Sequence, residues 1–128
     1  MAADLKFAKT HEWIRPEAGG LATVGISAYA VEALTDLVFM QLPQVGRKVK
    51  AGESIGEIES VKAVSDFYAP VSGEIVAVNA AVPNALETLG QDPYGAGWLV
   101  KIRPDDPADM AALLDQAAYD ALVAAGGH

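Results

Sequence analysis

Lys62 is the residue whose type and position in this chain best suit covalent chemistry. It lies between two strand-like segments, with Glu59 three residues before it and Asp66 four residues after it. A lysine at a tight turn is accessible to a modifying enzyme, can form an amide and stands on a flexible four-carbon stem. Its neighbours Val61 and Ala63 offer no competing amine. These features suggest an attachment site for a carried group; the alternative is an ordinary solvated lysine.

Other kinds of site are not supported by the sequence. The 128 residues include no cysteine, which excludes disulfides, thiolate metal sites and a cysteine nucleophile. The two histidines, His11 and His128, lack the spacing of a metal-binding pair, so we expect no metal site. We find no nucleophile–base pair or phosphate-binding loop of an independent enzyme, so no catalytic residue is predicted. A formal net charge of −8 disfavours nucleic-acid binding.

Length and composition suit one globular domain over residues 1–128. Apolar residues make up 52% of the chain and charged residues 20%, which is unlike a disordered tail. The N-terminus resembles neither a signal peptide nor a transit peptide. The longest apolar run near the middle, Leu37–Met40, is too short for a membrane span. We therefore expect a monomeric cytoplasmic protein of bacterial type, although a processed mitochondrial form would look the same.

Many short strands must position the lysine. Gly and Pro interrupt the middle of the chain at short intervals, and period-two alternation recurs between them, which predicts a β-sandwich or barrel. The segment EIVAVN is apolar on both faces, as in a sandwich core. The expected apolar faces are Ala22, Val24 and Ile26; Val38, Met40 and Leu42; and Trp98, Val100 and Ile102.

A short repeat surrounds the lysine. A Gly–Glu–Ile core occurs at Gly56–Ile58 and again at Gly73–Ile75. This echo indicates two similar strand units, with Lys62 at the connection between them.

Helices are expected only at the edges of the sheets. Ser27 is a suitable cap for a helix extending to Leu34. Asp106 and Pro107 resemble an N-cap and first helical position, followed by Met110, Leu113 and Leu114 on one helical face. Asp115 is a second potential cap, with Tyr119, Leu122 and Val123 facing inward. We expect these C-terminal helices, at about 106–125, to pack on the sheets.

Six segments together resemble the lipoyl-carrying H protein of the glycine cleavage system, in order and over nearly the whole chain. Co-linear THEW, ESVKA and DPYGAGW are the most specific of the matching motifs. The segments are Thr10–Trp13, Val24–Leu34, Leu42–Gly46, Glu59–Asn79, Asp92–Ile102 and Leu113–Leu122.

This resemblance implies a mainly β fold, a hybrid barrel-sandwich of the biotinyl and lipoyl type, with short peripheral and C-terminal helices. It implies lipoate in amide linkage to Lys62, attached by a lipoate ligase or lipoyltransferase. The lipoyl arm would take an aminomethyl group from glycine decarboxylase and present it to the tetrahydrofolate-dependent aminomethyltransferase. Dihydrolipoamide dehydrogenase would then reoxidise it. The chain would be a carrier without catalytic activity of its own.

The resemblance also implies roles for other residues. Glu12 and Asp66, with Thr10 as a supporting hydroxyl, would form the cleft that holds the loaded arm. Glu59 and Gly73 match positions read by the lipoate-attaching enzymes. The alternative for Glu12 is an exposed acid beside a buried Trp13, and the alternative for Asp66 is a surface acid. Likewise, Glu59 could be only a solvated acid and Gly73 only a turn glycine.

Three departures from the family pattern are visible. Thr10 stands where relatives often have Ser, Val64 stands where many have Thr, and the loop at 86–91 diverges. The competing interpretations are a biotin or 2-oxoacid dehydrogenase lipoyl domain, an H-like protein that donates lipoate or only binds partners, and an enzyme. The first lacks the THEW motif and terminal helices, and the last lacks a recognisable site.

Overall fold

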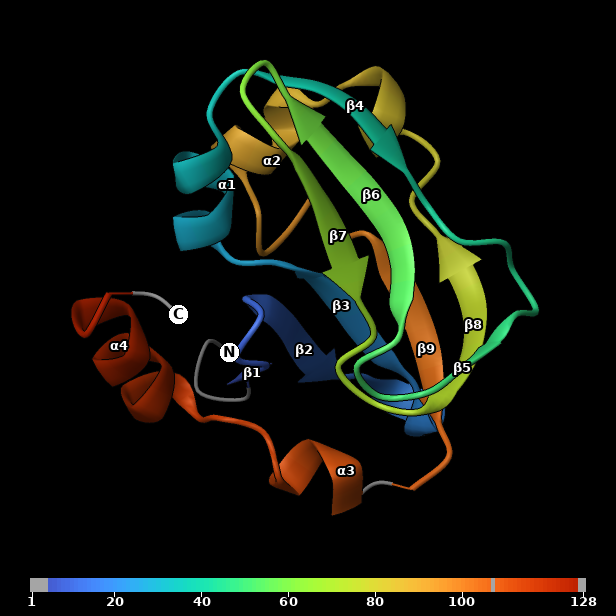
Figure 1. Cartoon of the computed structure of the whole chain (residues 1–128). Coiled ribbons are helices and arrows are strands. Elements are labelled where there is room, and N and C mark those ends of the chain that lie inside the picture. The colour runs from blue at the N-terminus through green and yellow to red at the C-terminus, as the bar shows by residue number, and fades with distance from the viewer. Residues whose placement is uncertain (1–4, 107, 127–128) are drawn as a thin grey trace.

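The structure is a computed structural model that describes residues 5–106 and 108–126 (Figure 1). The strands are β1 (Lys6–Phe7), β2 (Glu12–Pro16), β3 (Ala22–Ile26), β4 (Leu37–Gln41), β5 (Lys48–Val49), β6 (Ser54–Ser60), β7 (Val64–Tyr68), β8 (Gly73–Val78) and β9 (Val100–Pro104). The helices are α1 (Ala28–Leu34), α2 (Glu87–Gln91), α3 (Ala108–Ala111) and α4 (Gln116–Ala124), with 3₁₀ turns at Ala18–Gly20 and Val82–Asn84. The prediction of a mainly β chain with short peripheral helices is confirmed.

The strands form two antiparallel sheets. Six strands pair in the order β1-β2-β3-β9-β8-β5, and three pair in the order β4-β6-β7. Their inner faces share one apolar core, in which side chains from both sheets, such as Val24, Ile58 and Ile75, are buried. Burial of apolar surface between the sheets is the main stabilising contribution of such an arrangement.

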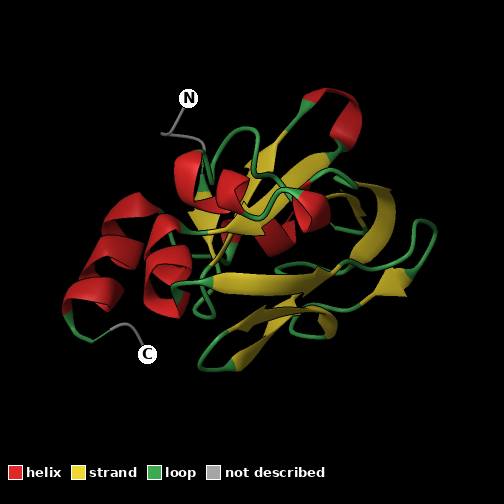
Figure 2. Cartoon of the chain, turned by 90° about the horizontal axis from the view of Figure 1, so that it is seen from above, coloured by secondary structure: helices red, strands yellow, loops and turns green. Residues whose placement is uncertain are grey.

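A second, smaller core joins the C-terminal helix to the edge of the larger sheet. The Tyr119 ring on α4 stacks on the Phe7 ring of β1 with 4.2 Å between ring centroids, and Leu5 and Trp13 complete the buried cluster. Figure 1 shows α4 beside the sheets and away from β4, and in Figure 2 the helix next to the C-terminus again lies beside the strands. This helix therefore braces the N-terminal strands.

All three predicted helix caps are present, and the Asp106 carboxylate accepts a hydrogen bond from the Ala108 amide at 2.9 Å. The Ser27 hydroxyl accepts a hydrogen bond from the Ala30 amide at 3.2 Å, and the Asp115 carboxylate accepts one from the Ala118 amide at 2.8 Å. Pro107 lies outside the described residues. The prediction that Leu113 and Leu114 lie on a helical face is wrong, because α3 ends at Ala111. Leu114 instead pairs with Phe7 through two backbone hydrogen bonds that extend the sheet edge.

Two strand predictions also need correction. Val38 does not share a face with the buried Met40, because the pairing of β4 with β6 is irregular between Leu37 and Phe39. This irregularity leaves Val38 56% exposed. Trp98 precedes β9 rather than lying within it and packs against the smaller core, whereas Val100 and Ile102 are buried in the larger one as predicted.

The same steric constraint explains why glycine occupies both repeated positions. A Cβ atom at Gly56 would overlap the carbonyl oxygen of Gln41, and one at Gly73 would overlap the carbonyl oxygen of Arg103. Gly56 lies within β6 and Gly73 starts β8, and at each position the neighbouring strand passes too close for any side chain. The echo in the sequence therefore corresponds to two equivalent close approaches, one in each sheet.

Gly73→Ala should destabilise the fold, because backbone of β9 would have to move to accommodate the methyl group. We expect a loss of roughly 1–3 kcal/mol in the free energy of unfolding, measured by urea denaturation. Gly90→Ala is the matched control, since a Cβ there meets no atom within 4 Å. That change in α2 should be neutral or stabilising by up to about 1 kcal/mol. Equal effects of the two substitutions would refute the close-approach explanation.

Candidate functional site

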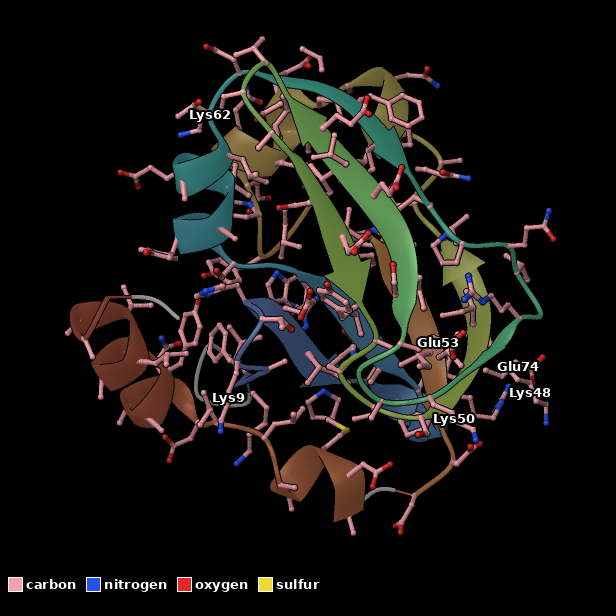
Figure 3. The ribbon with its side chains drawn as sticks, viewed as in Figure 1. Lys9, Lys48, Lys50, Glu53, Lys62 and Glu74 are labelled. Carbon is pink, nitrogen blue, oxygen red and sulfur yellow. The ribbon has the colours of Figure 1, made fainter. Side chains whose placement is uncertain are left out.

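Lys62 occupies the tip of the turn between β6 and β7, the central and outer strands of the smaller sheet (Figure 3). The turn is held from within, because the Ser60 amide donates to the Ala63 carbonyl at 2.8 Å. It is also held from the side, because the Val61 amide donates to the Asp36 carbonyl at 3.1 Å. The backbone at the tip is therefore fixed.

The side chain of Lys62 is exposed above this fixed backbone. Among the described residues, its ammonium group forms no ion pair. Ser60 is 8% exposed, and its hydroxyl oxygen accepts from the Ala63 amide at 3.2 Å, which orders the turn without engaging the amine. The chemistry available here is that of an accessible primary amine, which can be acylated by a partner enzyme.

Glu12 is the most unusual acid of the described chain. It lies at the start of β2 and is only 1% exposed. The Thr10 hydroxyl donates to Oε1, and the Tyr68 amide donates to Oε2 at 3.0 Å. Burial raises the pKa of the carboxyl group to about 7, although hydrogen bonds from Thr10 and Tyr68 oppose this shift. At neutral pH the group is therefore poised to gain or lose a proton.

Asp66 belongs to the same neighbourhood through Tyr68. Asp66 is exposed on β7, and the Tyr68 hydroxyl donates to its Oδ2 at 3.3 Å. The charge of Asp66 is the largest cause of a raised pKa of the Tyr68 phenol, and Glu12 contributes in the same direction. Tyr68 thus bonds one carboxylate through its backbone and the other through its side chain.

The turn that carries Glu12 is fastened by a polar contact with α4. His11 has φ of +80°, and its carbonyl accepts from the Ser27 amide at 2.9 Å. The Tyr119 hydroxyl lies 2.8 Å from His11 Nδ1 and 2.6 Å from the Ser27 oxygen. Positive φ is disfavoured for histidine, so these contacts hold the turn in a conformation that it would not otherwise prefer.

The structure brings Thr10, Glu12 and Asp66 into one hydrogen-bonded neighbourhood with Tyr68. Thr10 and Asp66 are exposed, whereas Glu12 is buried. A hollow of about 570 Å³ and another of about 730 Å³ are both lined by other residues. The predicted site therefore consists of one buried acid, Glu12, and an exposed rim made by Asp66 and Thr10.

The two predicted recognition residues lie at different ends of the molecule. Glu59 is on β6 near Lys62, where it pairs in register with Phe39 and Val64. Gly73 is buried at the start of β8, adjacent to Glu74, which is at the end away from Lys62 (Figure 3). The structure does not bring Gly73 to the lysine tip, and its close contact with β9 explains its small size.

Sequence reasoning missed Tyr68, Tyr119 and Ser60 as parts of the site. The Tyr68 contact uses a backbone amide, which no side-chain pattern reveals. Tyr119 was expected to face inward, but its bonds to His11 and Ser27 join segments about one hundred residues apart. The serine before a tight lysine turn was the one usable signal, because Ser side chains commonly bond nearby backbone amides.

In the part of the chain that the structure describes, no helix has the length and hydropathy needed to cross a bilayer. Within the same residues, no three His, Cys, Asp or Glu side chains gather as a set of metal ligands.

Comparison with known proteins gives a consistent result. Residues 5–125 match the family model described as Glycine cleavage H-protein. The glycine cleavage system H protein of Cronobacter sakazakii is 55% identical over 120 residues, 94% of this chain and 93% of that protein. The protein of the same name from Laribacter hongkongensis is 52% identical over 118 residues, 92% of this chain and 93% of its own length.

A solved structure agrees with these sequence matches. The crystal structure of a glycine cleavage system H protein from Mycobacterium marinum superposes with a TM-score of 0.85 at 46% sequence identity. The superposition covers 95% of this chain and 98% of that one. The predicted barrel-sandwich hybrid fold is thereby confirmed.

Burial of Glu12 predicts a pH dependence of stability that can be isolated. The carboxyl pKa is raised from 4.5 to about 7, so the fold favours the protonated form. The contribution of this group to the free energy of unfolding is fully present below about pH 4.5. It is lost as the pH rises through about 7, by on the order of 3 kcal/mol. Glu12→Gln should remove this loss. Urea denaturation at pH 5 and pH 8 tests it, and parallel pH profiles of parent and variant would contradict it.

Proposed function

This chain belongs to the glycine cleavage H-protein family, and from that membership we propose that it is the lipoyl-carrying shuttle of a glycine cleavage system. It would take an aminomethyl group from glycine decarboxylase and deliver it to aminomethyltransferase, which uses tetrahydrofolate. Dihydrolipoamide dehydrogenase would restore the oxidised arm. The chain itself would be a carrier and no catalyst. Since the similar proteins are bacterial, we expect it to work in the cytoplasm.

The observation that supports this function best is the exposure of Lys62 on a rigid turn. The turn is held by bonds from the Ser60 amide to Ala63 and from the Val61 amide to Asp36. The Lys62 ammonium group pairs with no described acid. An amine at such a tip can enter the active site of a lipoate ligase or lipoyltransferase, and its flexible stem adds reach afterwards. The lysine fits amide-linked lipoate, and we propose that it is the attachment residue.

A bound lipoyl group supplies a reactive disulfide, chemistry that this cysteine-free chain cannot perform. The residues of the chain then have three tasks, which are to present the arm, to shelter its cargo and to hold a proton. A lack of protein thiols suits these tasks, because none is present to exchange with the disulfide of the arm.

Glu12, with Asp66 and Thr10 at the exposed rim, is proposed to receive the cationic end of the cargo. Glu12 has a pKa of about 7 because it is buried, and a nearby ammonium group would lower that pKa and favour the carboxylate. Docking of the cation would therefore release a proton from Glu12, and departure would restore it. Exposed Thr10 and Asp66 would meet the cargo first.

Glu59 and Gly73 are proposed as recognition residues for the enzyme that attaches lipoate. For Glu59 the support is its position on β6, three residues before Lys62. For Gly73 the support is weaker, because its neighbour Glu74 lies far from Lys62 (Figure 3). A glycine there is needed for the approach of β9 in any case.

Incubation of the chain with lipoate, ATP and a lipoate ligase should add one lipoyl group to Lys62. Peptide mass mapping after digestion would locate the modification. Lys62→Arg should abolish it, because the guanidinium group stays protonated and does not act as an acyl acceptor. The same variant should be inactive as carrier in a reconstituted glycine cleavage reaction.

Lys50→Arg is the matched control, because Lys50 is exposed at the opposite end of the molecule (Figure 3). It should be lipoylated at Lys62 at the parental rate. Modification at another lysine, or of no residue in the parent chain, would refute the proposed attachment site.

Loss of either carboxylate should shorten the lifetime of labelled cargo that the chain has acquired from glycine. A partly desolvated, charge-assisted hydrogen bond contributes roughly 1.5–3 kcal/mol, so Glu12→Gln should speed spontaneous release about tenfold or more. Asp66→Asn should have a smaller effect, because Asp66 is exposed. The release of the labelled one-carbon unit measures this rate. Unchanged release in both variants would eliminate the sheltering role.

A further inference from the structure

A groove separates the two short helices beside the lysine tip. Its volume is about 570 Å³, and it lies between α1 and α2, which are neighbours in Figure 1. Its floor is apolar and includes the buried Val31 and Leu89 and the half-buried Leu37 and Leu86. A groove of this size can hold one or two apolar side chains of a partner. None of the residues assigned above to the arm or its cargo lines it.

The rim of this α1–α2 groove is acidic. Glu32, Asp36 and Glu87 line it, and all three are exposed. Among the described residues that line it, none is a lysine or arginine. An apolar floor with three carboxylates at the rim is complementary to a segment that has an apolar side chain flanked by basic ones. It is poorly suited to an acidic segment, which the same carboxylates would repel.

The groove is joined directly to the attachment turn. The Asp36 carbonyl that accepts from the Val61 amide at 3.1 Å belongs to a groove residue, and Val61 is adjacent to Lys62. A partner seated in the groove is therefore placed against the base of the lysine. An enzyme that acts at the far end of a long arm has no need of this position. An enzyme that forms a bond to Nζ must reach the tip itself.

We propose that the α1–α2 groove is the docking site for a basic, apolar-anchored segment of the enzyme that attaches lipoate to Lys62. This inference rests on the proposed function and adds a recognition surface to it. Docking would hold the lysine amine at the partner's active site. There, Nζ attacks the carboxyl carbon of an acyl-adenylate, the amide bond forms, the bond to adenylate breaks, and the amine loses one proton.

One wall of the groove is formed by segment 86–91, the loop at which this chain diverges from the family pattern. It contains the whole of α2 and contributes Leu86, Glu87 and Leu89 to the groove. Gly90 also faces the groove, and a Cβ atom there would meet no atom within 4 Å. A larger side chain at Gly90 can therefore fill the groove without displacing the core.

Two kinds of variant test the proposal through the Michaelis constant of a lipoate ligase for this chain as acceptor. Gly90→Phe should raise KM about tenfold by filling the groove, with kcat within twofold of the parental value. Gly90→Ala should raise it much less, because one methyl group occupies little of the space. Combined Glu32→Gln and Glu87→Gln should raise KM several-fold at low salt, and the difference should shrink at high salt because ions screen exposed charges.

Matched controls alter the same properties elsewhere. Ala117→Phe places an aromatic ring on the exposed face of α4, and combined Asp105→Asn and Asp120→Asn removes two exposed charges that do not line the groove. Both should keep the parental KM. Direct titration of the ligase with each variant in a Lys62→Arg background measures docking without acylation, and the same order of affinities is expected.

Parental KM and affinity in both Gly90→Phe and the double glutamine variant would overturn the groove while leaving Lys62 lipoylation intact. An equal rise in the two control variants would also overturn it, since the effect would then be one of general charge or surface change. Failure of the parent chain to be lipoylated at Lys62 would instead remove the proposed function and this inference together. If thermal unfolding shows Gly90→Phe to be unfolded, the glutamine variant decides, because it changes only exposed carboxylates.

Discussion

A single buried carboxyl group fastens the two sheets to each other. Glu12 is on β2 of the six-stranded sheet, and its Oε2 accepts from the backbone amide of Tyr68 on β7 of the three-stranded sheet at 3.0 Å. An apolar core holds sheets together without fixing their offset, because hydrophobic contacts are non-directional. A hydrogen bond between a side chain and a backbone amide is directional, so it sets where β7 lies relative to β2. The cost of burying the acid appears as its raised pKa.

The position of Lys62 follows from this bond through a short rigid path. Tyr68 ends β7, and β7 pairs along its length with β6, the central strand of its sheet. The turn at the far end is closed by Ser60 and held against Asp36. At the near end, Tyr119 contacts His11 and Ser27 beside Glu12. The exposed lysine side chain stands on an otherwise fixed arrangement, which suits the proposed carrier role.

Elements with local signals were predicted well from the sequence. Ser27 and Asp115 cap helices as their types suggest, and the strands on either side of Lys62 form the expected turn. Leu114 and Val38 were misplaced because pairing with β1 in one case and an irregular register in the other overrode the local pattern. These are contacts between distant segments, and periodicity carries no information about them.

In the candidate site, too, local features were predictable from the sequence and contacts between distant segments were not. Lys62 was identifiable because its exposure depends on the turn around it. The link from Glu12 to Asp66 through Tyr68 was not identifiable from residue types, because one half of it is a backbone amide. The resemblance to a known family supplied the two carboxylates, whereas their physical connection required the relative placement of both sheets. The repeated glycines at 56 and 73 needed the structure for the same reason.

Charge is distributed unevenly between the two ends of the molecule. On α1, α2, β4, β6, β7 and the turns at 35–36 and 61–63, the acids are Glu32, Asp36, Glu57, Glu59, Asp66 and Glu87, and the described basic residue is Lys62. The other end carries charges of both signs, with Lys48 and Lys50 close to Glu53 and Glu74 (Figure 3). A basic partner within about a Debye length, roughly 8–10 Å, is therefore attracted more strongly to the lysine end than to the end of mixed charge. For the proposed carrier, such orientation before contact would mean that fewer encounters begin at the wrong face.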